Sequence, residues 1–180
     1  MSNTQPTIAV RLLQEQIGFA HYALEETVKD VPIEIATHQP VGKARSIGSY
    51  YAHIFIVEDW GVNGLIQGHA PLFASGWREK TGFDSLPPLE QTKLLGWSHH
   101  VESDVVSTHN YAQAVIANTA AYLNELHDDD LARMVNLEEI GFGQMTVGRI
   151  LSDFVLTNCN FHTGEISCLK GSHGLKGYPW

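Results

Sequence analysis

The stretch from Val147 to Leu169, VGRILSDFVLTNCNFHTGEISCL, is the most informative part of this chain. Positions spaced three and four residues apart share one face of a helix. Here that face carries Val147, Leu151, Phe154, Asn158, His162, Ile166 and Leu169. Most of these side chains are apolar. The pattern therefore predicts a helix from about Thr146 to Leu169 that packs in a core and turns two polar side chains inward.

Three other stretches show the same periodicity, over about residues 8–28, 46–67 and 101–126. Ser46 is the predicted N-cap of the second, because its side-chain oxygen can accept from the free N–H groups of the first turn. Four amphipathic helices of this length predict an all-α fold, a four-helix bundle whose neighbouring helices run antiparallel.

The longest connection lies between the second and third helices. Glycine and proline interrupt it between about residues 68 and 96, and a short helix is expected near 89–95. Residues 131–137 alternate as a strand would, but no second strand is evident to pair with it. We expect a single helical domain over residues 1–180.

Composition and charge narrow the function. The chain has 180 residues, of which 43% are hydrophobic and 17% charged, so it can bury a core without disulfides. Its net charge of −9, with scattered Lys and Arg residues, excludes the basic face that a nucleic-acid-binding protein needs. No apolar run is long enough to span a membrane, and residues 1–10 lack the pattern of a signal peptide. A cytoplasmic location is expected, as are two reduced cysteines, Cys159 and Cys168.

Two histidines are the candidates for chemistry. His53 lies in the first half of the second helix, near its apolar face, and His162 lies on the apolar face of the fourth. Asn158 precedes His162 by four residues, so their side chains point about 40° apart, one turn along the helix. That spacing lets two side chains hold one ion, and helix bundles build metal sites from facing helices. The alternative is that each polar side chain only satisfies a hydrogen bond in the core.

Short motifs in the second and fourth helices resemble those of the DinB/YfiT-like family. The segment SIGSYYAHI at 46–54, followed by Glu58 and Trp60, resembles the family's second helix with its histidine. The segment HTGEI at 162–166 resembles the family's His-x-Gly-Gln/Glu-Ile signature, and GLKGYP at 174–179 is similar to the tail of many members. The motifs are short, and their specificity comes from their order and their separation.

The resemblance implies a four-helix bundle that holds a divalent metal, often zinc or nickel, with three histidines. His53 and His162 match the first and third of these ligands, but Asn158 stands where the second histidine is expected. An amide oxygen is a poor ligand for zinc, so this departure predicts a weak metal site or none. Glu58 and Glu165 are expected to be outer partners that orient the ligands.

Three functions remain open on this basis. The resemblance implies a metal-dependent enzyme for a small-molecule substrate, such as a thiol-dependent S-transferase or isomerase, or a hydrolase, with a small-molecule thiol as co-substrate. The second function is a non-catalytic binding or stress-associated protein with a degraded metal site, and the third is a pH-responsive histidine cluster. A homodimer is expected, because the tryptophans offer apolar area for an interface. These are Trp60, Trp77, Trp97 and Trp180.

Overall fold

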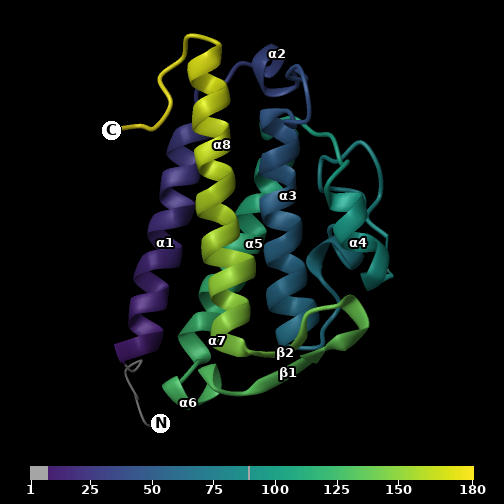
Figure 1. The fold of residues 1–180 in the computed structure, drawn as a ribbon, viewed down its shortest axis with the longest axis vertical. Coiled ribbons are helices and arrows are strands. Elements are labelled where there is room, and N and C mark those ends of the chain that lie inside the picture. Colours follow the sequence, from purple (N-terminus) through teal and green to yellow (C-terminus); the bar gives the residue numbers. More distant parts are fainter. Residues whose placement is uncertain (1–7, 89) are drawn as a thin grey trace.

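Long helices form at all four periodic stretches in the computed structural model, which describes residues 8–88 and 90–180 (Figure 1). Two of the four contain a π-helical segment. The elements are α1 (Ile8–Val28), α3 (Ile47–Asp59) with π-helix η1 (Trp60–Ile66), α5 (Val105–Glu125), and α7 (Val147–Ile150) with π-helix η4 (Leu151–Thr157) and α8 (Asn158–Ser172). The all-α expectation and the four-helix bundle are confirmed.

Short elements connect the long helices. They are α2 (Ile33–Ala36), 3-10 helix η2 (Leu72–Ala74), α4 (Gln91–Ser98), α6 (Asp128–Leu131), strand β1 (Met134–Leu137), 3-10 helix η3 (Glu138–Ile140) and strand β2 (Gly143–Thr146). The short helix expected near residues 89–95 corresponds to α4, although residue 89 lies outside the described part of the chain. The expectation that residues 1–10 lack the pattern of a signal peptide also falls largely outside it, because residues 1–7 are not described.

Side-chain caps set the starts of α3 and α5. Ser46 Oγ accepts from Ser49 N, as predicted. Asp104 Oδ1 accepts from Ser107 N, and this cap starts α5 at Val105 rather than at the predicted residue 101.

The strand expected near residues 131–137 has a partner. β1 pairs antiparallel with β2, with Met134 opposite Thr146 and Leu137 opposite Gly143. The expectation of an unpaired strand was therefore wrong. The partner strand is only four residues long and ends at Thr146, whose side chain caps α7, so its sequence merges with the predicted start of the last helix.

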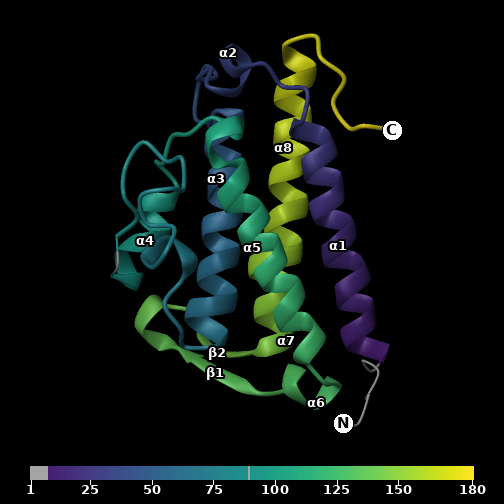
Figure 2. The same ribbon diagram turned by 180° about the vertical axis from the view of Figure 1, so that it is seen from behind.

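The long helices do not simply alternate in direction, and the antiparallel arrangement of neighbours expected from the sequence is wrong for two pairs. The connection from η1 to α5 runs back along the bundle past α4, so α5 runs in the same direction as α3 (Figures 1 and 2). The N-terminus of α3 accordingly lies against that of α5, where the backbone carbonyl of Ser103 packs on Gly48. α1 and α8 likewise run parallel and pack on each other. The long crossover connection is what permits this order.

Helix α3 is the core of the bundle. All thirteen of its residues are buried, including the polar residues His53, Glu58 and Asp59. It packs against α5, α8 and α4, and a helix covered on every side has no solvent face. None of the described helices is long and apolar enough to cross a bilayer.

Candidate metal centre

The fold brings His53 of α3 against His162 of α8. Their ring centroids are 4.9 Å apart, and the rings meet edge to face at 86°. His53 is 3% exposed, whereas the His162 side chain is 18% exposed. Two imidazoles, separated by more than a hundred residues in the sequence, thus form one pair that solvent reaches from the His162 side.

Hydrogen bonds fix the tautomer of both rings. His53 Nδ1 lies 3.1 Å from the carbonyl oxygen of Ser98, which can only accept, so Nδ1 carries the proton. His162 Nδ1 lies 2.5 Å from Glu165 Oε2 and donates to that carboxylate. The Tyr50 hydroxyl donates to the other oxygen of Glu165 at 3.2 Å. Each histidine is therefore left with the lone pair on Nε2, the form that binds a metal.

Burial keeps both imidazoles neutral. It lowers the pKa of His53 to about 2, with further lowering by the positive charge of Arg45. Burial also lowers the pKa of His162, although the Glu165 carboxylate opposes this effect. Neutral imidazole is the form that can ligate, so the pair needs no deprotonation at neutral pH.

Asn158 lies beside the pair with an unsatisfied amide. It lines the same cavity of about 280 Å³ as His53, together with Val57, Arg149 and Phe154. Its Nδ2 atom is buried and donates to no partner among the described residues. A buried amide group without a partner costs about 1–3 kcal/mol. A 180° turn of the amide would place Oδ1, an acceptor, where Nδ2 now lies.

The structure adds His99, whose position the sequence did not predict. Its ring stacks on His53 with centroids 5.1 Å apart. Arg45 Nη2 lies 2.6 Å from His99 Nδ1, and since a guanidinium only donates, Nδ1 is the acceptor. The lone pair of His99 is therefore already used, and within residues 8–88 and 90–180 no group of three His, Cys, Asp or Glu side chains is arranged to hold a metal.

Glu58 does not lie with the pair, contrary to expectation. Its Oε2 lies 2.8 Å from His21 Nε2 of α1, and its Oε1 accepts from the Thr119 hydroxyl of α5 at 2.6 Å. Five residues after His53, a side chain points about 140° away around the helix. Glu58 therefore serves a second buried cluster, and of the two carboxylates expected beside the ligands only Glu165 contacts one.

The cysteines are both free thiols, with Cys159 buried and Cys168 exposed. Burial raises the pKa of the Cys159 thiol, and the Glu58 carboxylate raises it further. A buried thiol held in the protonated form is a poor nucleophile. The histidine pair is therefore the stronger candidate for chemistry at this site.

The fold is an all-α bundle with a histidine pair between two of its long helices, and sequence comparison gives the family. A profile of the DinB superfamily matches residues 16–166, so the chain belongs to that superfamily. A conserved protein of Enterococcus faecalis, known from its crystal structure, superimposes with a TM-score of 0.73 at 20% identity. The match covers 89% of this chain and 94% of that chain, and it establishes the fold. No curated protein matches the chain.

Proposed function

We propose that this chain is a metal-dependent enzyme that acts on a small molecule, with a divalent ion held by His53, His162 and Asn158. The observation that supports this most strongly is the pair of fixed tautomers. Ser98 and Glu165 each take the Nδ1 proton of one histidine, which leaves two Nε2 lone pairs on facing helices.

The donors present fit a metal ion, though a weakly held one. Two neutral imidazoles suit zinc or nickel. The amide of Asn158 now lacks a hydrogen-bond partner at its buried Nδ2 atom, which costs free energy. Coordination of a metal through Oδ1 would remove this cost, which supports Asn158 as the third donor. An amide in place of a third imidazole lowers the affinity, since it is the poorer donor for zinc.

In this proposal, the chain's own residues bind the metal ion and orient its two imidazole ligands. Ser98 and Glu165 hold the two imidazoles, and Tyr50 holds Glu165 in turn. A divalent ion bound there would lower the pKa of a thiol or water placed beside it and so produce a nucleophile near neutral pH. The 280 Å³ cavity beside His53 has room for a small substrate, and we place a small-molecule thiol or water there.

The test measures catalysis at the pair. Zinc- and nickel-loaded protein is mixed with cysteine and monobromobimane, a thiol-reactive fluorogenic electrophile, and separately with p-nitrophenyl acetate as a probe of water activation. The loaded wild type should exceed the His53→Ala/His162→Ala double variant by at least about tenfold with one of the probes. Equal rates, with metal demonstrably bound to the wild type, would contradict the enzyme proposal and leave a metal-binding bundle.

A second candidate is a non-catalytic homodimer, which an aromatic patch on the surface favours. The patch consists of Phe19, Tyr22, Tyr178 and Trp180. Phe19 stacks on Trp180 with ring centroids 5.7 Å apart, and Trp180 is 64% exposed. Trp60, by contrast, is buried and contributes nothing to such a surface. A second copy of the chain would cover the patch and offset the cost of exposing it to water.

We expect sedimentation at micromolar concentration to show a dimer for the wild type and a monomer for Phe19→Glu. The charge would be buried without a partner in the interface, which costs several kcal/mol. Val106→Glu is the matched control, because Val106 is an exposed apolar residue of α5 outside the patch. A wild type that sediments as a monomer, or a control that dissociates equally, would remove this proposal.

A further inference from the structure

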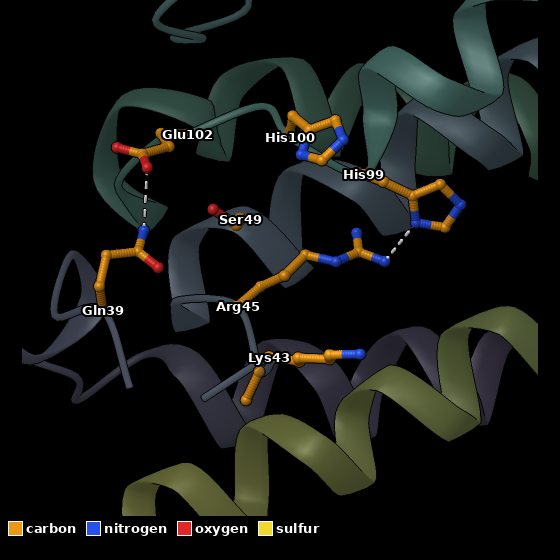
Figure 3. A pocket seen from close by; sticks show the side chains of 8 residues that line it. Gln39, Lys43, Arg45, Ser49, His99, His100 and Glu102 are labelled. Carbon is orange, nitrogen blue, oxygen red and sulfur yellow. Dashed lines mark hydrogen bonds between the residues drawn. The ribbon is translucent and has the colours of Figure 1, made fainter. Parts of the chain in front are cut away.

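A second cavity of about 440 Å³ adjoins the histidine pair and is lined by basic side chains. It lies between the loop before α3 and the end of α4. Its polar lining consists of Gln39, Lys43, Arg45, Ser49, His99, His100 and Glu102. Figure 3 shows Arg45 reaching across the cavity to His99, with Lys43 extending alongside it. His99 also stacks on His53, so the cavity is one ring away from the candidate metal centre.

Lys43 and Arg45, the lysine and arginine of this cavity, form no ion pair with a carboxylate of the described residues. The chain carries a net charge of −9, and five of its eleven Lys and Arg residues form ion pairs within the described part of the chain. Neither Lys43 nor Arg45 forms one there. The one carboxylate in the lining, Glu102, accepts from Gln39 Nε2 at 3.0 Å, at the far end from Arg45. In an acidic protein, two neighbouring unpaired cations mark a local positive potential.

Arg45 is held as a rigid donor. Its Nη1 donates to the Ser98 carbonyl at 3.3 Å, Nη2 donates to His99 Nδ1, and Cζ lies 5.2 Å from the centroid of the Tyr50 ring. These contacts use part of its five N–H donors and leave the others for a ligand. The side chain is partly buried, and burial lowers the pKa of Arg45 although the nearby Tyr50 and Glu165 oppose this effect. A bound anion would offset the remaining cost of removing this cation from water.

The same residues connect this cavity to the reactive centre. Tyr50 lies under Arg45 and also packs against the His162 ring, with centroids 5.2 Å apart. Ser98 accepts from Arg45 and from His53. These shared contacts place Arg45 close to both imidazoles, so a small molecule whose anionic group is held at Arg45 would lie next to the histidine pair.

We infer that this cavity binds the carboxylate or phosphate group of the small molecule on which the site acts, through Arg45 and Lys43. That the bound molecule is a substrate rests on the proposed function, whereas the anion binding itself rests on the cavity alone. It narrows the substrate, or the thiol co-substrate, to a small organic anion. Arginine supplies the planar donor pair that suits either group, and Lys43 adds a second positive charge.

The test is a titration of the full-length, metal-free protein, prepared without residual chelator because common chelators are themselves carboxylates. Inorganic phosphate and succinate are added separately at constant ionic strength, and binding is followed by NMR of the backbone amides. Saturable shifts at Arg45, Ser49 and His100 are expected with at least one anion. A response to phosphate alone or to succinate alone supports the inference and identifies the group.

Matched variants separate a built site from general attraction. Arg45→Met should weaken binding by about tenfold or more. Lys43→Met should weaken it several-fold, and this exposed side chain makes no hydrogen bond in the described structure whose loss would disturb folding. Lys80→Met is the control, because Lys80 is also exposed and forms no ion pair with the described residues, but does not line the cavity.

The inference is overturned by the absence of a saturable shift with both anions, or by an equal loss of affinity in Lys80→Met and Lys43→Met. His162→Ala separates it from the proposed function. That variant should lose metal binding and keep anion binding. If the wild type binds an anion but no metal, the proposed function fails and the anion site stands. If it binds a metal but neither anion, the inference of an anion site fails and the metal site stands.

Discussion

Replacement of Asp59 by alanine is expected to lower the free energy of unfolding by about 3–5 kcal/mol. Asp59 is fully buried at the end of α3, and its two oxygens accept from four donors. The donors are Asn63 Nδ2, Leu72 N, Phe73 N and the Tyr111 hydroxyl, at 2.7–3.0 Å. Alanine would leave all four buried or partly buried donors without an acceptor. The carboxylate therefore ties the long connection and α5 to the core helix.

Urea unfolding monitored by circular dichroism measures this loss. Asp59→Asn keeps the shape of the side chain but has only one accepting oxygen, so it should lose a smaller part of the stability. Asp129→Ala, a change at an exposed residue of α6, should alter stability by less than about 0.5 kcal/mol. If Asp59→Ala costs no more than this control, the four hydrogen bonds do not hold the connection in place.

Glu58→Ala is expected to cost a comparable amount, about 3–5 kcal/mol, for a different reason. Glu58 is fully buried and its partner His21 is 6% exposed, so the variant leaves a buried imidazole without its carboxylate. Burial lowers the pKa of His21, but the Glu58 charge and hydrogen bond outweigh this and the net shift is upward. The upward shift of the pKa favours the protonated imidazole beside the carboxylate, and the hydrogen bonds of Glu58 join α1 and α5 to α3.

Two further measurements distinguish this pair from simple packing. The double variant His21→Phe/Glu58→Met removes both charges together and should recover most of the loss, because a buried pair replaced by apolar groups is often neutral. Because the folded pKa of His21 is raised, its contribution is complete below the unfolded value of 6.5 and declines as the pH rises through the folded value. The stability difference between wild type and Glu58→Ala should therefore narrow as the pH rises from below 6.5 through the folded pKa of His21. A double variant no more stable than the single one would contradict the ion pair.

Local signals in the sequence were sufficient for the long helices. The periodicity of residues 8–28 gave the bounds of α1, and Ser46 was placed as the N-cap because capping involves only neighbouring residues. The π-helical segments η1 and η4 were not predicted, because a change from 3.6-residue periodicity over seven residues leaves the apolar pattern nearly intact. The parallel course of α3 and α5 depends on the path of the connection, which no local pattern encodes.

Only the residues of the candidate site that lie in the family motifs could be predicted from the sequence. His53 and His162 were chosen from those motifs and from the apolar face of the last helix, and the structure places their rings together. Glu58 was assigned to the wrong side of α3. This helix is buried on every side, so its sequence pattern does not indicate which face packs against which neighbouring helix. His99 was missed because it lies at the end of α4, and tertiary packing alone brings that helix against His53.

The most direct test of the central claim is zinc binding measured by calorimetry on metal-free, untagged protein. The wild type should bind a stoichiometric amount of zinc, and the His53→Ala/His162→Ala double variant should bind none. Asn158→His supplies a third imidazole where the buried amide now lacks a partner. It should bind at least about tenfold more tightly, or about 1.4 kcal/mol, and should unfold at a higher temperature with zinc present. Wild type and double variant with the same response to zinc would contradict the claim that His53 and His162 hold a metal.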